Sequence, residues 1–184
     1  MPWEARTKMA NKYVITGGPC VGKSTLIAAL QEKGYQTLPE VARLVIEEQQ
    51  GTDGKILPWI DRDSFQQAVM KRQLELEGKV NGKPVFLDRG LADGAGYYLA
   101  DNLKVPRELN TAINENRYSG VFLLDPLKDY KTDSARVEDS EAASRIHGCI
   151  GQAYENAGYK VVRVPAVSVE ERVKFILNEI RSKN

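Results

Sequence analysis

Cysteine and histidine are scarce in this sequence. Among its 184 residues there are two cysteines, Cys20 and Cys149, and the only histidine is His147. Two distant cysteines in no metal-like spacing do not form a disulfide framework, and one histidine excludes a histidine-rich zinc site. The sequence therefore favours a reducing compartment.

Long apolar runs and an excess of one charge are also lacking. No stretch approaches eighteen apolar residues, and residues 1–11 contain no apolar segment typical of a signal peptide. The 26 basic and 25 acidic residues leave a net charge of +1, too little to attract nucleic acid or an anionic membrane. We expect a cytoplasmic protein without a membrane span or nucleic-acid partner, with 1–11 as a loose tail and 12–184 as one domain.

Short apolar runs alternate with helical patterns along the rest of the chain. Strands are predicted over residues 13–16, 35–38, 84–88, 121–124 and 159–164. Helices are predicted over residues 23–33, 40–50, 61–78, 91–102, 106–117, 140–157 and 169–180. Strands joined by helical crossovers form a parallel sheet. The sequence therefore predicts a three-layer α/β/α fold around a five-stranded parallel sheet.

A glycine-rich motif follows the first predicted strand and opens the first predicted helix. It fits G-x-x-x-x-G-K-[ST] at every fixed position and consists of Gly17, Gly18, Pro19, Cys20, Val21, Gly22, Lys23 and Ser24, followed by Thr25. Glycines let backbone N–H groups close around phosphate oxygens, and the helix start adds unpaired N–H groups. The motif predicts a P-loop that binds a nucleoside triphosphate. Lys23 is expected at the β- and γ-phosphates, Ser24 on Mg²⁺ and Thr25 near the α-phosphate.

Asp88 and Arg89 end the third predicted strand, at the sheet edge where ligands bind in such folds. Asp88 could hold Mg²⁺ together with Ser24, or take a proton from an attacking hydroxyl. Arg89 could hold the acceptor or the transferring phosphoryl group. The alternative for both residues is a polar strand end followed by a turn.

Glu40 and Arg43 follow the second predicted strand and share one face of the helix that starts there. Glu40 could act as general base toward a hydroxyl acceptor, with Arg43 also near the acceptor. Equally, Glu40 could complement the helix dipole while Arg43 is a solvated partner. The sequence favours neither interpretation.

Arg136 lies in the polar stretch 126–139 that follows the fourth predicted strand. This stretch could be a lid in which Arg136, with Lys128, Lys131 or Arg145, closes over the phosphates and stabilises charge in the transition state. It could equally be a charged surface loop.

Other polar residues on the predicted helices favour structural roles. Gln66 or Gln73 could recognise a base, but an amphipathic helix with Phe65 in the core is the favoured interpretation. His147 is expected on a helix surface or in a small polar pocket.

Taken in order, these segments resemble the NadR-like P-loop ATPase/kinase family, which includes the ribosylnicotinamide kinase domain of NadR. The resemblance starts near Lys12 and rests on residues 17–25, 39–43, 87–90 with Asp93, then Tyr130, Asp133, Arg136 and Glu138, and finally 158–162 and 168–172. It implies a nucleoside-kinase-like core, a lid arginine at Arg136, and Mg²⁺ near Ser24 and Asp88.

The residues together predict a kinase that transfers the γ-phosphoryl group of ATP to a small nucleoside- or nucleotide-like acceptor. Lys23, Mg²⁺, Arg89 and Arg136 would supply the positive charge, and Asp88 or Glu40 would orient or deprotonate the acceptor. The alternative is a switch or binding module that hydrolyses ATP or GTP and acts through a partner. An ordinary GTPase is disfavoured because no N-K-x-D motif is present. The acceptor and the oligomeric state stay open.

Overall fold

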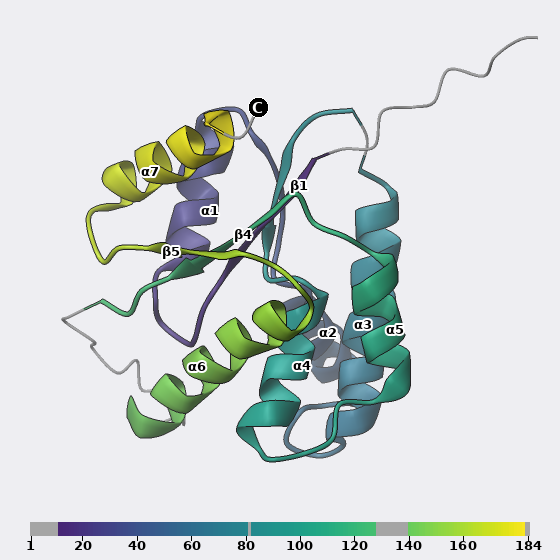
Figure 1. Cartoon of the computed structure of the whole chain (residues 1–184). Coiled ribbons are helices and arrows are strands. Elements are labelled where there is room, and N and C mark those ends of the chain that lie inside the picture. Colours follow the sequence, from purple (N-terminus) through teal and green to yellow (C-terminus); the bar gives the residue numbers. More distant parts are fainter. Residues whose placement is uncertain (1–10, 81, 128–139, 183–184) are drawn as a thin grey trace, which may run out of the picture.

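The computed structural model describes residues 11–80, 82–127 and 140–182, which form five strands connected by one or two helices each, with a seventh helix after the last strand (Figure 1). The strands are β1 (Lys12–Thr16), β2 (Gln36–Leu38), β3 (Val85–Asp88), β4 (Gly120–Leu124) and β5 (Val161–Val164). The helices are α1 (Lys23–Glu32), α2 (Val41–Gly51), α3 (Arg62–Gly78), α4 (Leu91–Ala100), α5 (Arg107–Glu115), α6 (Ser140–Asn156) and α7 (Val169–Arg181). Every strand and helix predicted from the sequence is present.

All strand pairs in the sheet are parallel, and the strand order is β2-β3-β1-β4-β5. β1 is the central strand, with Ile15 opposite Asp88 of β3 on one side and Phe122 of β4 on the other. The carboxyl ends of β1, β2 and β3 therefore meet at one edge, which is where the predicted site residues begin.

Alternate residues of each central strand pack into opposite layers of the molecule. Tyr13, Ile15 and Phe86 contribute to one core beneath α1 and α7. Val14 and Leu87 contribute to the other core, beneath α4, α5 and α6. This alternation is the period of two expected for a strand buried on both faces. The fold is thus the predicted three-layer α/β/α arrangement (Figure 1).

Two helices begin at the polar residues that the sequence suggested, but one residue later than predicted. Asp61 is the N-cap of α3, and its carboxylate accepts a hydrogen bond from Ser64 N at 3.0 Å. Glu40 precedes α2 in an extended conformation, and its side chain makes no capping bond to that helix. The Glu40 carboxylate is therefore available to contacts outside α2.

Two segments of the predicted domain organisation are not covered by the described residues. The first ten residues of the predicted tail lie outside them, as do residues 128–139 of the predicted lid with Lys128, Lys131 and Arg136. Within the described part of the chain, no helix combines the length and apolar character that crossing a membrane requires.

Candidate functional site

The glycine-rich loop between β1 and α1, called the phosphate loop here after its predicted role, contains three residues with positive φ: Gly17, Cys20 and Gly22. Gly22 precedes α1 with φ +88°, a conformation that L-residues with a side chain rarely adopt. Gly22, the N-cap of α1, provides no side-chain cap, and no side chain among the described residues is seen to accept from the first turn. The N–H groups of that turn therefore point out of the helix end without an intramolecular cap, and an anion can accept from them.

Lys23 is folded back onto this loop and is only 6% exposed. Its ammonium group donates to the carbonyl oxygens of Gly18 at 2.6 Å and Gly17 at 3.2 Å. Burial, reinforced by the positive charge of Arg89, lowers the pKa of Lys23 to about 7, against the opposing influence of Asp88, Glu40 and Asp93. The environment of Lys23 thus disfavours the protonated form of its amine, and a bound anion would favour that form.

Asp88 lies at the end of β3 directly beside the start of α1. Ser24 Oγ donates to Asp88 Oδ2 at 3.2 Å, while Oδ1 is buried with no hydrogen-bond partner among the described residues. Burial and the nearby Glu40 carboxylate raise the pKa of Asp88 to about 6, although Lys23, Arg89 and the Ser24 hydroxyl act in the opposite direction. A buried carboxylate oxygen without a donor is the kind of atom that a cation or its bound water satisfies.

The chemistry of this corner fits Mg²⁺ rather than a metal held wholly by protein ligands. Mg²⁺ in nucleotide sites takes one or two protein oxygens, with phosphates and waters completing an octahedron. The Ser24 hydroxyl and the Asp88 carboxylate provide such oxygens side by side. No group of three or more histidine, cysteine, aspartate or glutamate residues forms a metal cluster in the described part of the chain.

Arg89 has an unusual backbone conformation and a buried guanidinium group. Its φ is +73°, a left-handed conformation that costs an ordinary residue roughly 1 kcal/mol or more and that concentrates at functional sites. The guanidinium donates to Glu40 Oε1 at 2.9 Å, to Asp93 Oδ1 at 2.9 Å and to the Gly17 carbonyl at 3.3 Å. Arg89 therefore joins the ends of β2 and β3 to the phosphate loop.

Glu40 is drawn into the site by this arginine. Its side chain is 24% exposed, and the pair it forms with Arg89 joins residues 49 positions apart in the sequence. The Glu40 carboxylate accepts from Arg89 and makes no capping bond to α2, so it lies beside Arg89 at the end of β3.

Asp93 fixes the position of Arg89 and of the residues around it. Each of its two carboxylate oxygens accepts two hydrogen bonds. Oδ1 accepts from Thr16 Oγ1 at 2.6 Å and from Arg89 at 2.9 Å. Oδ2 accepts from the Tyr154 hydroxyl at 2.7 Å and from Gly90 N at 3.0 Å. A buried carboxylate that is fully bonded fixes the position of its partners. β1, the turn after β3 and α6 are therefore joined at this residue.

A family model described as an AAA domain matches residues 12–172. The chain belongs to the AAA domain family. No curated protein sequence matches the chain.

Solved structures similar to this AAA domain protein include a thymidylate kinase, a deoxyadenosine kinase and NadR. Thymidylate kinase from Candida albicans is 16% identical with a TM-score of 0.62, over 95% of this chain and 92% of the kinase. Deoxyadenosine kinase from M. mycoides is 18% identical with a TM-score of 0.62, over 94% of this chain and 100% of the kinase. NadR in complex with NR is 18% identical with a TM-score of 0.63, over 86% of this chain but 44% of NadR. The fold is that of the P-loop kinases, and the resemblance to the NadR-like family is confirmed.

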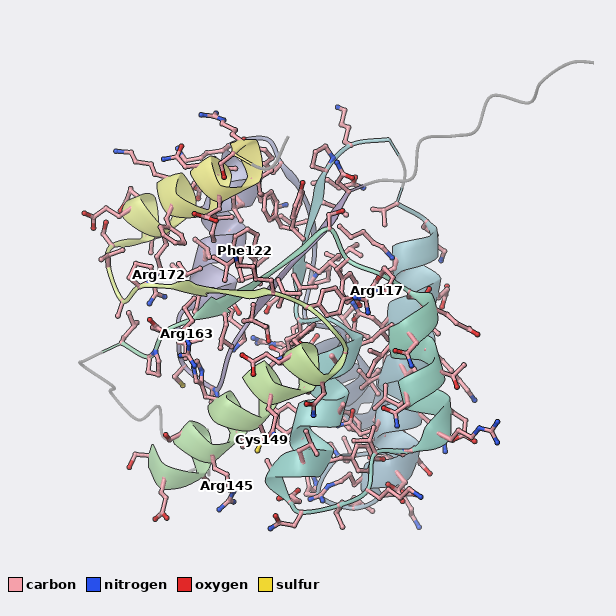
Figure 2. The ribbon with its side chains drawn as sticks, viewed as in Figure 1. Arg117, Phe122, Arg145, Cys149, Arg163 and Arg172 are labelled. Atoms are coloured by element: carbon pink, nitrogen blue, oxygen red, sulfur yellow. The ribbon has the colours of Figure 1, made fainter. Side chains whose placement is uncertain are left out.

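Sequence reasoning missed the role of Arg172, which supports the phosphate loop of the AAA domain from outside. Arg172 is 2% exposed and reaches from the start of α7 toward the sheet (Figure 2). Its guanidinium donates to the carbonyls of Val21 at 2.6 Å, Asp125 at 2.9 Å and Pro165 at 3.0 Å. An arginine on an amphipathic helix resembles any solvated residue in sequence, so no local signal indicated this contact.

The sequence also did not indicate that His147 contacts the phosphate loop. It is 8% exposed, and its Nδ1 accepts a hydrogen bond from Gly18 N at 3.1 Å. Of the two positions expected for His147, a helix surface and a small polar pocket, the structure shows the buried one. The imidazole contacts the phosphate loop there.

Two of three further residues considered for the site lie elsewhere in the AAA domain. Arg43 is exposed and pairs with Glu47 at 3.0 Å, one turn along α2, so it does not join Glu40 near the site. Arg145 lies on the outward side of α6, away from the sheet (Figure 2). Gln73 is buried on α3, and its side-chain amide donates to Glu77 at 2.8 Å and to the Arg89 carbonyl at 3.5 Å, so it lies beside the backbone of Arg89.

Proposed function

We propose that this protein is a kinase that transfers the γ-phosphoryl group of ATP to a small nucleoside- or nucleotide-like acceptor. The observation that carries the proposal is the convergence of Lys23, Asp88, Arg89 and Glu40 beside the start of α1. A loop that only held a phosphate would not need an arginine–carboxylate pair at the ends of β2 and β3. That pair lies where a second substrate can meet the triphosphate.

The phosphate loop binds the triphosphate in this proposal. The backbone N–H groups of residues 17–25 surround the phosphates, and Lys23 leaves the Gly17 and Gly18 carbonyls to contact them. Ser24 and Asp88 hold Mg²⁺, which when bound neutralises charge on the phosphate oxygens. Arg89 keeps its charge at every accessible pH and stabilises the transferring group.

The two carboxylates take different roles because their surroundings differ. Asp88 is 4% exposed and already bonded to Ser24, which suits a position beside the metal. Glu40 is more accessible and is oriented by Arg89, which suits contact with an acceptor hydroxyl. We therefore assign the general-base role to Glu40.

The proposal is tested by incubating the protein with ATP, Mg²⁺ and a panel of nucleosides and nucleotides, with products detected by mass. We expect one acceptor class to gain a phosphoryl group. Glu40→Gln should lower kcat by about 100-fold or more while ATP binding persists, because loss of a general base typically costs that much. Glu47→Gln removes an exposed carboxylate from the same helix and serves as the matched control.

ATP binding without phosphorylation of any acceptor would contradict the proposal. Slow ATP turnover that no acceptor stimulates would instead favour a hydrolysing switch that acts through a partner.

A further inference from the structure

His147 is a buried titratable residue that contacts the phosphate loop and that the proposed chemistry does not use. It lies on α6, 129 residues from Gly18, yet its Nδ1 accepts from the Gly18 amide at 3.1 Å. Gly18 immediately precedes Pro19, and the loop turns there toward Gly22 and α1. The contact therefore holds the first part of the loop, before the amides at the start of α1.

The loop and α6 approach each other too closely for a side chain at residue 18. A Cβ atom on Gly18 would lie 3.0 Å from the Ala143 carbonyl oxygen and 3.0 Å from His147 Cβ. Such contacts are tighter than ordinary van der Waals distances. The backbone at Gly18 therefore packs closely against α6. The loop would have to shift before a water molecule could replace the imidazole as the acceptor.

The contact requires one particular form of the imidazole. Nδ1 can accept from an N–H group only when it carries no proton, so His147 must be neutral with its proton on Nε2. Nε2 is buried and meets no acceptor among the described residues. A protonated ring would direct Nδ1–H at the Gly18 N–H group, so the contact would be lost.

The charges around the ring act mainly against protonation. Burial is the main cause that lowers the pKa of His147 below its ordinary value, and Arg163 and Lys23 act in the same direction. Asp125 acts in the opposite direction, but its Oδ1 is paired with Arg163 at 3.3 Å. Figure 2 shows Arg163 between β5 and α6, and His147 belongs to α6.

We propose that His147 is a positioning residue for the phosphate loop, whose neutral imidazole holds the Gly18 amide and whose protonation releases the loop and weakens nucleotide binding. This inference rests on the proposed function only in that the loop binds a nucleoside triphosphate. It assigns His147 no contact with the nucleotide.

The first experiment observes the imidazole directly. Because His147 is the only histidine in the sequence, nitrogen-15 NMR of untagged protein reports its tautomer and titration without assignment. We expect a neutral ring with the proton on Nε2 at pH 7.5 and a pKa below the ordinary histidine value. A proton on Nδ1, or a ring that titrates like a free histidine, would contradict the proposal. Neither readout needs a nucleotide.

The second experiment compares ATP binding by His147→Asn, His147→Leu and the wild type from pH 5 to pH 8. The asparagine oxygen can accept from Gly18 in place of Nδ1 but does not titrate, whereas leucine cannot accept. At pH 7.5 we expect affinity within about twofold of wild type for asparagine. For leucine we expect a loss of about fivefold or more, as for a buried amide left unpaired.

The pH profile separates a positioning role from a merely structural one. Asp88 and Lys23 also titrate in this range, so the informative quantity is the ratio of the asparagine variant's affinity to that of wild type. We expect this ratio to rise as the pH falls through the NMR-measured pKa and to level off at the loss that leucine shows at pH 7.5. A constant ratio, or an asparagine variant as weak as leucine, would overturn the proposal. A protein that binds ATP with this profile but phosphorylates no acceptor would refute only the kinase proposal.

Discussion

Binding of a nucleoside triphosphate is expected to make the protein take up a proton at Lys23. The pKa of Lys23 is lowered to about 7, mainly because the ammonium group is buried. A triphosphate brings several negative charges beside this group and restores its preference for the charged form. The number of protons taken up on binding therefore measures how strongly the loop without nucleotide disfavours the protonated form of Lys23.

The magnitude follows from the pKa. At pH 8 a group with a pKa of about 7 is about 9% protonated, so saturating ATP should draw about 0.9 proton into the complex. Asp88, with a pKa of about 6, is about 99% ionised at pH 8 and so contributes almost nothing. Since the charged fraction of Lys23 falls about tenfold from pH 8 to pH 9, Kd should rise about tenfold over the same interval.

Titration calorimetry at pH 8 in two buffers of different ionisation enthalpy gives the proton count. Lys23→Arg is the informative variant, because a guanidinium group keeps its proton throughout this range. It should bind ATP with no proton uptake and with a Kd that is unchanged between pH 8 and pH 9. His147→Asn should retain the wild-type uptake.

Two results would refute the reasoning. Wild-type binding at pH 8 without proton uptake would mean that Lys23 is already charged in the empty loop. Equal uptake by wild type and Lys23→Arg would place the proton on another group.

Two further predictions concern stability. Asp88→Asn should stabilise the empty protein by about 1–3 kcal/mol at pH 7 in urea unfolding, because it removes a buried charge, while Mg²⁺-dependent ATP binding is lost. Because the pKa of Asp88 is raised in the folded state from 3.8 to about 6, the folded state holds more protons between these values. Wild-type stability should therefore fall relative to the variant as the pH rises from about 4 to 6, and a parallel pH dependence would contradict this. Arg172→Met leaves three carbonyls without their donor and should lower the free energy of unfolding by about 2–4 kcal/mol; an unchanged urea midpoint would refute this.

The fold followed from local patterns because each strand and helix carries its own signal. The apolar run Val85–Asp88 is buried along its whole length, as a central parallel strand must be. Segment ends were less well predicted. α5 ends at Glu115 instead of residue 117 because Asn116 leaves the helical conformation. Such changes depend on tertiary contacts that the pattern does not contain.

The parts of the candidate site that form one continuous segment could be predicted from the sequence. The parts that the fold brings together from distant segments could not. The glycine-rich loop is one short segment, and its spacing carries the prediction. The Arg89–Glu40 pair depends on β2 lying beside β3, a neighbour relation that follows from the strand order. The contacts of His147 and Arg172 with the loop span 129 and 151 residues and involve backbone atoms, which any sequence could supply.

Asp93 has a consequence for how this fold can diversify. The four groups bonded to its carboxylate come from β1, the turn after β3 and α6, so one of the two carboxylates that orient Arg89 is fixed without any contribution from α2; the other is Glu40. Exposed positions of α2 and of the segment that joins it to α3 can therefore be exchanged without loosening this arginine. If the proposed transfer takes place here, substitutions in that one stretch of chain could change the acceptor while Asp93 keeps its contact with Arg89.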